Sequence, residues 1–307
     1  MGVRATAASK TRSCVHHALA AVLRLATRTN LPRLVYAAKK VEQALPMRLR
    51  NVGLYRVRRW KLLWNLQLED ALQRGLFFRG EGTFRRLSRH ISHTVREGDV
   101  VLDIGANIGS FALPVAAHSG PRVVYAFEPA ASTFARLREN VALNHLESKV
   151  VPVPLALGED TGRKELRASE HYGSKASSTF TLHGIGDPVE EVAVTSVDRW
   201  FEEAGLSQVD VVKVDVEGSE FAVVQGMTNL LNTSARPRSL IVEVIDDLLD
   251  QAGASWTMLR DVLQEHGYEP YEPTPGGGLQ RVLGAPSVRD VIFTYAGSRQ
   301  PTGRRDA

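Results

Sequence analysis

The fold is set by the stretch Val100-Val101-Leu102-Asp103-Ile104-Gly105-Ala106-Asn107-Ile108-Gly109. Its apolar first half shows little alternation, which is typical of a strand buried on both faces of a parallel sheet. Gly105 and Gly109 then allow a tight turn and the close approach of a ligand, because glycine has no Cβ. The helix expected after Phe111 would present unpaired backbone N–H groups toward that turn. The stretch therefore predicts a cradle for a nucleotide-type ligand.

The residues around this turn discriminate between two such ligands. A dinucleotide-binding turn reads Gly-x-Gly-x-x-Gly, and its second glycine makes room for a pyrophosphate. Here Asn107 stands in place of that glycine, and the carboxylate of Asp103 would repel a pyrophosphate. The next apolar run ends in Glu128, 23 positions after Gly105, near the spacing at which an acidic residue accepts hydrogen bonds from ribose hydroxyls. Since Asp103 also suits an ammonium and a sulfonium group, S-adenosylmethionine is favoured over NAD.

Four sequence elements stand in the order and spacing of one enzyme family. They are Asp103-Ile-Gly105-Ala106-Asn107-Ile-Gly109, Phe127-Glu128-Pro129, the pair Asn140 and Asn144, and Lys213-Val-Asp215-Val-Glu217-Gly218-Ser-Glu220. Over roughly residues 60–295 the chain resembles the FkbM family of methyltransferases. The resemblance implies a class I methyltransferase fold and O-methylation of a hydroxyl on a sugar, a polyketide or a similar small molecule. It also implies that the cofactor contacts Asp103, Gly105, Ala106, Asn107, Gly109 and Glu128, with Ala156 and Leu157 beside the adenine ring.

The order of expected elements predicts an α/β fold. From Val100 onward, strands and helices alternate, which indicates a doubly wound, mostly parallel sheet with helices on both faces. The run 150–157 is the expected third strand, and its two prolines favour an irregular or edge position. We expect a basic N-terminal segment at 1–49, the methyltransferase-like domain at 50–296, and a disordered tail at 297–307.

Residues 163–197 depart from the simple alternation. Two expected strands flank a long polar loop, which predicts a cover over the substrate. His171 and His183 in this loop are candidates for proton transfer, although a histidine in a polar loop is more often solvated. Asp198 is the expected N-cap of the next helix.

A second informative stretch begins at Val209 and carries three charges. Lys213, Asp215 and Glu217 alternate with valines, so a strand would place all three on one face at the end where α/β sheets bind ligands. Buried charges are costly unless they are paired or used, and Glu243 at the end of the next strand should come near them. We predict Asp215 as the base or hydroxyl-orienting group, Glu217 as the second choice, and Lys213 as the group that tunes their charge. A divalent cation held by Asp215, Glu217 and Glu243 is a less favoured alternative, and we predict no metal site.

Composition sets the compartment and the partners. Residues 1–100 carry 20 Lys and Arg against 6 Asp and Glu, whereas the remainder carries 18 against 28. The single Cys14 fits a reducing cytosol, so we expect a cytoplasmic location. The basic segment 15–45 has three open interpretations: a helix packed on the domain or a partner, peripheral contact with an anionic membrane or acidic partner, or an organelle-targeting segment.

Rival functions are weaker. An NAD-linked oxidoreductase conflicts with Asn107, and a binding module that senses S-adenosylmethionine while its basic head contacts membrane or nucleic acid leaves Asp215 and Glu217 without a role. Nucleic acid is not an expected substrate, because base methyltransferases often carry an Asp/Asn-Pro-Pro-aromatic turn where this chain has Asp-Val-Glu-Gly. Trp60 and Trp64 would suit a sugar or a macrocycle, but such residues more often belong to a core.

Overall fold

The computed structural model describes residues 54–59, 61–67, 73, 76–77, 94–168, 180–182, 187–274 and 278–297. The chain forms two compact units, one of residues 1–85 with 174–177 and one of residues 86–173 with 178–307. The basic segment 1–49 and residues 298–307 of the expected tail lie outside the described residues. The membrane contact expected for residues 15–45 therefore stays a prediction.

The described part of the first unit is a hairpin. Strands β1 (Leu54–Arg59) and β2 (Leu62–Gln67) pair antiparallel, with Arg59 opposite Leu62. Along β2 the buried side chains alternate with more exposed ones, as a strand with one covered face requires. Trp64 is completely buried, which favours its interpretation as a core residue. Trp60 lies outside the described residues.

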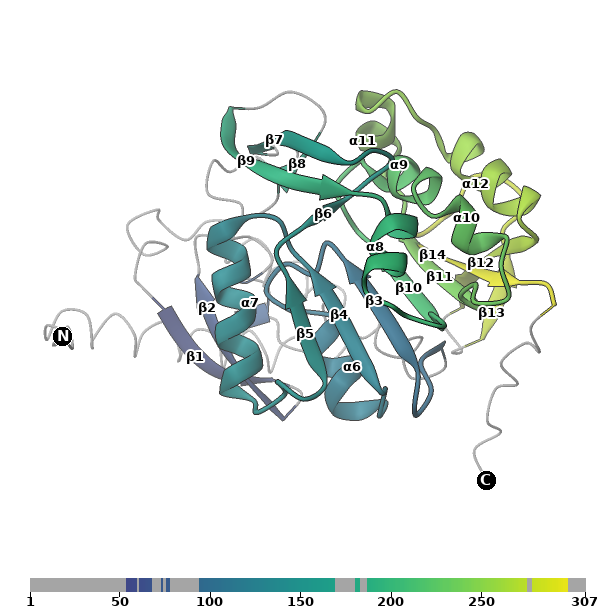
Figure 1. Ribbon diagram of the computed structural model, residues 1–307. Helices are drawn as coiled ribbons and strands as arrows, with labels where there is room; N and C mark the ends of the chain where they lie inside the picture. Colours follow the sequence, from purple (N-terminus) through teal and green to yellow (C-terminus); the bar gives the residue numbers. More distant parts are fainter. Residues whose placement is uncertain are drawn as a thin grey trace, which may run out of the picture. The chain divides into compact units, whose positions relative to one another are not determined.

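The second unit is built on an eight-stranded sheet with the order β13-β12-β14-β11-β10-β3-β4-β5 (Figure 1). The central strands β11, β10, β3, β4 and β5 are parallel, whereas β14, β12 and β13 extend the sheet antiparallel. Their bounds are β3 (Val100–Ile104), β4 (Val123–Phe127), β5 (Val150–Val153), β10 (Val211–Val214), β11 (Ser239–Glu243), β12 (Tyr268–Pro273), β13 (Leu279–Arg281) and β14 (Asp290–Tyr295). The predicted mostly parallel α/β sheet is confirmed.

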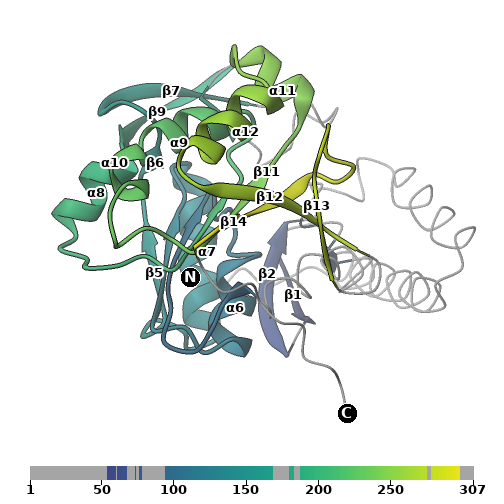
Figure 2. The ribbon, with the colours of Figure 1, turned by 90° about the vertical axis from the view of Figure 1, so that its right-hand side faces the viewer.

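Helices cover both faces of this sheet, as the doubly wound arrangement requires. Figures 1 and 2 show α8 and α10 on one face and α6 on the other. The bounds are α6 (Ala112–His118), α7 (Ala131–Leu143), α8 (Val197–Glu203), α9 (Glu220–Gln225), α10 (Thr228–Leu231), α11 (Asp246–Gln251) and α12 (Trp256–Glu265). Among the described residues, no helix has the length and apolar composition needed to cross a membrane.

The prediction of one strand over residues 150–157 was wrong. The chain leaves the large sheet after Val153, and β6 (Ala156–Leu157) joins a second sheet instead. Proline has no N–H to donate, so Pro152 and Pro154 favour an edge and an early exit from the ladder. β5 does lie at the edge of the large sheet, as the two prolines predicted.

The second sheet is formed largely by the segment that interrupts the alternation. Its order is β6-β9-β7-β8, with β7 (Gly162–Ala168), β8 (Phe180–Thr181) and β9 (Pro188–Thr195). β7 and β9 pair antiparallel, which confirms the two expected strands. His171 and His183 lie outside the described residues, and the role of residues 163–197 as a substrate cover stays a prediction.

Asp198 has a different role from the predicted one. The N-cap of α8 is Ser196, whose hydroxyl accepts a hydrogen bond from the N–H of Arg199. The carboxylate of Asp198 instead accepts from the N–H groups of Asn229 and Leu230, at 2.9 and 2.7 Å. It thereby caps α10 from a distance in sequence, because the first N–H groups of a helix have no partner within the helix.

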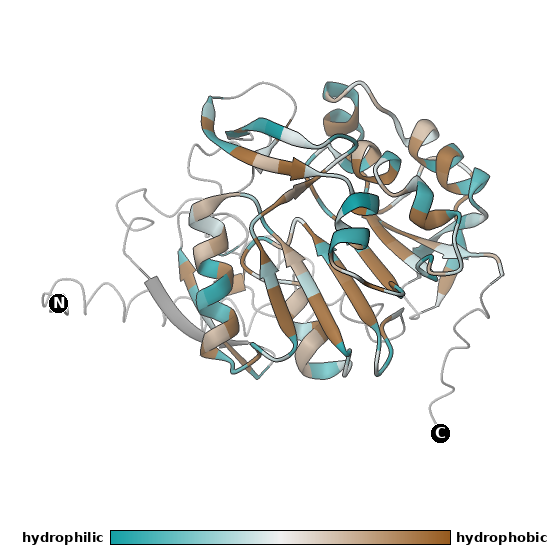
Figure 3. Ribbon diagram, viewed as in Figure 1, coloured by the Kyte–Doolittle hydropathy of each residue, from teal (hydrophilic) through white to brown (hydrophobic). Residues whose placement is uncertain are grey.

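The core of this unit lies between the central strands and the helices. Figure 3 shows the strands β3, β4 and β10 as predominantly hydrophobic. Every residue of β3 and of β10 is buried, including the charged Asp103 and Lys213. A buried charge is costly without a partner, so Asp103 and Lys213 indicate a paired or functional site near the carboxyl ends of these strands.

Candidate active site

The turn after β3 is closed by hydrogen bonds within the protein. The N–H groups of Gly105 and Ala106 both donate to the carbonyl oxygen of Phe127. The other donors of the turn are also used: Asn107 N–H by Glu128 (2.9 Å), Ile108 N–H by the Asn107 side chain (2.7 Å) and Gly109 N–H by the Ala106 carbonyl (2.8 Å). A pyrophosphate needs several available N–H groups, so this turn lacks the cradle of a dinucleotide site. The NAD-linked alternative is therefore not favoured.

Glu128 ties this turn to the end of β4. One carboxylate oxygen accepts from the N–H of Asn107 and the other from the N–H of Ala130, at 3.0 Å. Burial raises the pKa of Glu128 to about 8, although both hydrogen bonds favour its charged form. Each oxygen retains a second lone pair. The residue can thus accept ribose hydroxyls while it also fixes the conformation of the turn.

Asp103 lies beneath the turn rather than at its surface. One carboxylate oxygen accepts from the N–H of Ala112 at the start of α6, and the other lies 3.9 Å from Nζ of Lys213 without a hydrogen bond. Burial raises the pKa of Asp103 to about 6. The side chain is completely buried, so its predicted contact with the cofactor stays a prediction. Its position indicates an effect through Lys213 and the start of α6.

Lys213 and Asp215 form the central ion pair. Nζ of Lys213 lies 2.7 Å from Oδ2 of Asp215 and 5.6 Å from the centre of the Phe111 ring. Burial lowers the pKa of Lys213, but the charges of Asp215 and Asp103 outweigh it and the pKa is raised, so the lysine stays protonated. Burial alone would raise the pKa of Asp215, but the charge and hydrogen bond of Lys213, together with smaller contributions that include the charge of Arg289, outweigh burial and lower this pKa. Asp215 therefore keeps a negative charge.

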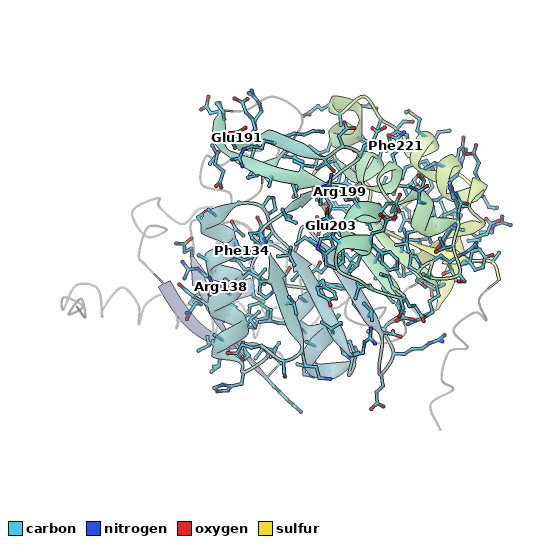
Figure 4. All side chains as sticks on the ribbon, in the orientation of Figure 1. Phe134, Arg138, Glu191, Arg199, Glu203 and Phe221 are labelled. Carbon is cyan, nitrogen blue, oxygen red and sulfur yellow. The ribbon has the colours of Figure 1, made fainter. Side chains whose placement is uncertain are left out.

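The environment distinguishes this pair from ion pairs on the surface. Arg199 and Glu203 on α8 lie 2.7 Å apart with more than half of each side chain exposed (Figure 4). Such pairs contribute little, because water screens both charges. In the central pair only 5% of the Lys213 side chain is exposed, against 33% of the Asp215 side chain. The cation is held inside the protein, and the carboxylate is accessible at the edge of the sheet.

Glu217 lies at the same site, but the backbone conformation that places it there is not the predicted strand. Strand β10 ends at Val214, and Glu217 adopts a left-handed backbone conformation with φ of 54°, so simple strand alternation does not apply. The conformation is fixed by Glu220, whose carboxylate accepts from the N–H groups of Val216 and Gly218 at 3.0 Å each. A glutamate at positive φ is strained, and such strain is concentrated at functional sites.

The charge state of Glu217 differs from that of Asp215. One of its carboxylate oxygens is buried without a hydrogen bond. Burial, and then repulsion by Asp215, raises the pKa of Glu217 to about 8. The two carboxylates predicted as catalytic are therefore neighbours with opposite shifts of pKa.

Glu243 joins this group from the end of β11, as predicted. Carboxylate oxygens of Asp215, Glu217 and Glu243 all lie within 4.8 Å of one another. These distances would allow the less favoured alternative, in which the three carboxylates hold a divalent cation. However, the charge of Asp215 is already opposed by Lys213, whose Nζ lies 2.7 Å away. The prediction of a site without metal is untested and is kept as a proposal.

The other predicted cofactor residues lie at or near the same edge. Ala156 and Leu157 form β6 and are almost completely buried, so only their backbone edges could meet an adenine ring. The structure also shows roles for Glu220 and Asn140, which belong to the family motifs. Glu220 fixes the backbone at Glu217 by accepting from the N–H groups of Val216 and Gly218. The Asn140 amide donates to the carbonyl of Ile108 at 3.1 Å and thereby supports the turn from α7.

The largely buried carboxyl groups lead to a prediction about pH. Burial raises the pKa of Asp103 to about 6, of Glu220 to about 7, and of Glu128 and Glu217 to about 8. Between their ordinary values and these values the folded state binds more protons than the unfolded state. The free energy of unfolding should therefore fall as pH rises from about 5 to about 8. Urea denaturation across this range measures it.

Glu220→Gln provides the control, because its amide oxygen can accept the same N–H groups but does not titrate. The variant should show a shallower decline of stability with pH. A stability that instead rises with pH over the same range would contradict the assignment of raised pKa values.

The sequence around this edge matches that of a known family. The sequence model described as the methyltransferase FkbM domain matches residues 103–270, which includes the turn, Glu128 and the Lys213–Glu220 stretch. The chain belongs to the FkbM methyltransferase family. This membership confirms the family predicted from the sequence.

Two relatives of this FkbM-family chain share less than a third of the aligned residues with it. The hexuronic acid methyltransferase AglP of Haloferax volcanii is 31% identical over 170 residues, which cover 55% of this chain and 66% of AglP, slightly less than two thirds. The 31-O-demethyl-FK506 methyltransferase FkbM of Streptomyces tacrolimicus is 30% identical over 202 residues, covering 57% of this chain and 74% of that protein. The crystal structure of methyltransferase FkbM from Methylobacillus flagellatus KT covers 66% of this chain and 48% of that one, with 17% identity and a TM-score of 0.41.

Proposed function

We propose that this protein transfers the methyl group of S-adenosylmethionine to a hydroxyl group of a sugar or of another small natural product. The position of Asp215 carries the proposal. Its carboxylate is charged, partly exposed and ion-paired at the ligand-binding edge of the sheet. Its backbone N–H donates to the carbonyl of Ile104, directly before the turn, at 3.0 Å. The acceptor-binding carboxylate and the cofactor-binding turn are thus adjacent.

The residues at this edge fit S-adenosylmethionine. The cofactor carries no phosphate, and the turn 105–109 has no N–H group left for one. Glu128 would hold the ribose hydroxyls through its remaining lone pairs, and the backbone edge of Ala156 and Leu157 would border the adenine. When bound, S-adenosylmethionine supplies a methyl group that is already activated by its sulfonium. The protein has mainly to align an acceptor oxygen and manage its proton.

Asp215, Lys213 and Glu217 have different proposed roles toward the acceptor hydroxyl. Asp215 would accept a hydrogen bond from the acceptor hydroxyl and take its proton as the hydroxyl oxygen bonds to the methyl carbon. The carbon–sulfur bond of the cofactor would break in the same step, with S-adenosylhomocysteine as the leaving group. A positioned base of this kind contributes roughly 10²- to 10⁴-fold. Lys213 keeps Asp215 charged and oriented at 2.7 Å. Glu217 is the alternative base, since its pKa of about 8 lies nearer to neutral pH than the lowered pKa of Asp215.

The proposed acceptor class rests on the relatives' names and on the chemistry of the site. AglP is named for hexuronic acid, and the Streptomyces protein for 31-O-demethyl-FK506. Hydroxyl-rich molecules also suit an edge that presents several carboxylates, because each carboxylate accepts hydrogen bonds from hydroxyls. Transfer of isotope-labelled methyl to panels of hexoses, hexuronates and macrocyclic polyketides would identify the acceptor.

Cofactor binding gives the first test. S-adenosylhomocysteine should bind in isothermal titration calorimetry, and NAD should not. Glu128→Gln should weaken S-adenosylhomocysteine binding about 10-fold or more, since it replaces a carboxyl oxygen available to the ribose hydroxyls with an NH₂ group, while the amide oxygen still accepts a backbone N–H. Glu272→Gln, a change of the same kind in β12, should bind normally. Absence of S-adenosylhomocysteine binding to the parent protein would refute the proposed function.

A further inference from the structure

The first turn of α7 is capped from a distant part of the chain. The first N–H groups of a helix need outside acceptors, and the N-cap residue here is Ala130, whose side chain offers none. The N–H of Ala131, the first residue of the helix, instead donates to the carboxylate of Glu190 in β9 at 2.9 Å. The two residues are 59 positions apart, so this hydrogen bond joins the second sheet to the start of α7 (Figure 1).

The capped turn is the one that begins with Glu128. The carboxylate of Glu128 accepts from the N–H of Ala130, and the N–H of the next residue, Ala131, donates to Glu190. Two successive backbone N–H groups are therefore bound by two carboxylates, one directly after β4 and the other in β9. Since Glu128 is the residue proposed to hold the ribose hydroxyls, its backbone surroundings include the contact with Glu190.

Apolar packing joins the second sheet to the same turn. Side chains at 190, 192 and 194 alternate with their neighbours along β9 and so share one face of the strand. The methyl group of Ala130 is completely buried in a small apolar cluster whose other buried members belong to the second sheet: Ala156, Leu166, Val192 and Val194. β9 also pairs with β6, the strand proposed to border the adenine, with Ala156 opposite Val194. One strand thus contacts both proposed parts of the nucleoside site.

We propose that Glu190 is a positioning residue for cofactor binding, which caps α7 from the second sheet and thereby holds the turn after β4 as Glu128 requires to receive the ribose hydroxyls. The inference rests on the proposed function, because it assigns the support of the ribose contact. Without Glu190 the turn would lose one of its two carboxylate contacts, and binding would have to order it at a cost in affinity. Such coupling is reciprocal, so a bound cofactor should in turn stabilise β9.

Calorimetric titration of the full-length protein with S-adenosylhomocysteine tests this role. Glu190→Ala removes the acceptor and should weaken binding about 3- to 10-fold, the effect of one hydrogen bond. Glu190→Gln keeps an amide oxygen that can accept from Ala131, so its affinity should lie within about 2-fold of the parent.

Glu191→Ala is the matched control. Glu191 is the next residue of β9 and lies on the opposite face of the strand, where its exposed carboxylate is 3.2 Å from Arg163. The residue is labelled in Figure 4. This variant removes the same kind of side chain from the same strand and should bind S-adenosylhomocysteine like the parent.

Hydrogen exchange provides a readout that a purely structural cap would not change. In the parent protein, S-adenosylhomocysteine should slow the exchange of the β9 amides more than that of the β12 amides, and the difference should be smaller in Glu190→Ala. A cap with a structural role alone would alter the free energy of unfolding but neither this protection nor the affinity of the folded protein.

The outcomes separate this inference from the proposed function. Unchanged affinity in Glu190→Ala would overturn the inference, and so would an equal loss in Glu190→Gln or in Glu191→Ala. Should Glu190→Ala not fold, the absence of selective β9 protection in the parent protein would overturn it as well. Failure of the parent protein to bind S-adenosylhomocysteine would instead refute the proposed function.

Discussion

Asp215→Asn should reduce kcat by roughly 10²- to 10⁴-fold, because the amide cannot take a proton from the acceptor hydroxyl. The substitution preserves the size of the side chain, and its amide oxygen can still accept a hydrogen bond from Lys213. Affinity for S-adenosylhomocysteine should be nearly unchanged, since the cofactor contacts proposed above come from the turn and Glu128. Transfer of labelled methyl and calorimetric binding, measured on the same preparations, check both parts.

Asp210→Asn is the matched control for this result. Asp210 precedes the same strand at its opposite end, where its carboxylate accepts from the N–H of Val100 at 2.8 Å and lies 3.5 Å from Arg238. This variant should lose stability but keep its turnover wherever it is folded. If Asp215→Asn turned over like the parent, Asp215 would have no part in the mechanism, and Glu217 would become the leading base.

The parts of the fold that the sequence predicts are those determined by burial. Strands covered on both faces of a parallel sheet need apolar side chains throughout, so β3 and β4 stand out as apolar runs. The exit of the chain at Pro154 could not be assigned, because prolines indicate an edge but not the sheet that the next residues join. The capping of α10 by Asp198 was missed for a similar reason. Its partners lie about 30 residues away, and local capping patterns do not reach them.

In the candidate site, too, some contacts were predictable from the sequence and others were not. The meeting of Asp215 and Glu243 was predictable, because the carboxyl ends of neighbouring parallel strands lie at one edge. The burial of Asp103 was not, since it follows from the register that places Asp103 beside Lys213. The position of Glu217 depends on hydrogen bonds from Val216 and Gly218 to a glutamate downstream. Strand periodicity contains no information about such a contact.

Gly105→Ala should be the most damaging single substitution in the cofactor turn. Gly105 has φ of 84°, and a Cβ at this position would lie 1.8 Å from the carbonyl oxygen of Asp215. An alanine in this conformation costs about 1–2 kcal/mol from its backbone alone. Displacing a packed neighbour costs about 1–3 kcal/mol more, and that neighbour is backbone, which cannot rotate away as a side chain can. Urea denaturation should show the sum of both effects.

Gly98→Ala separates the two contributions. Gly98 has nearly the same φ, 83°, but nothing lies within 4 Å of an added Cβ. It should therefore lose only the backbone contribution and bind S-adenosylhomocysteine like the parent. Gly105→Ala should also lose most of its cofactor affinity and its turnover, because the clash separates the turn from the residue that receives the acceptor hydroxyl. Equal stability of the two variants would show that Asp215 moves aside without cost, and the close approach of turn and carboxylate would then not be a requirement of the site.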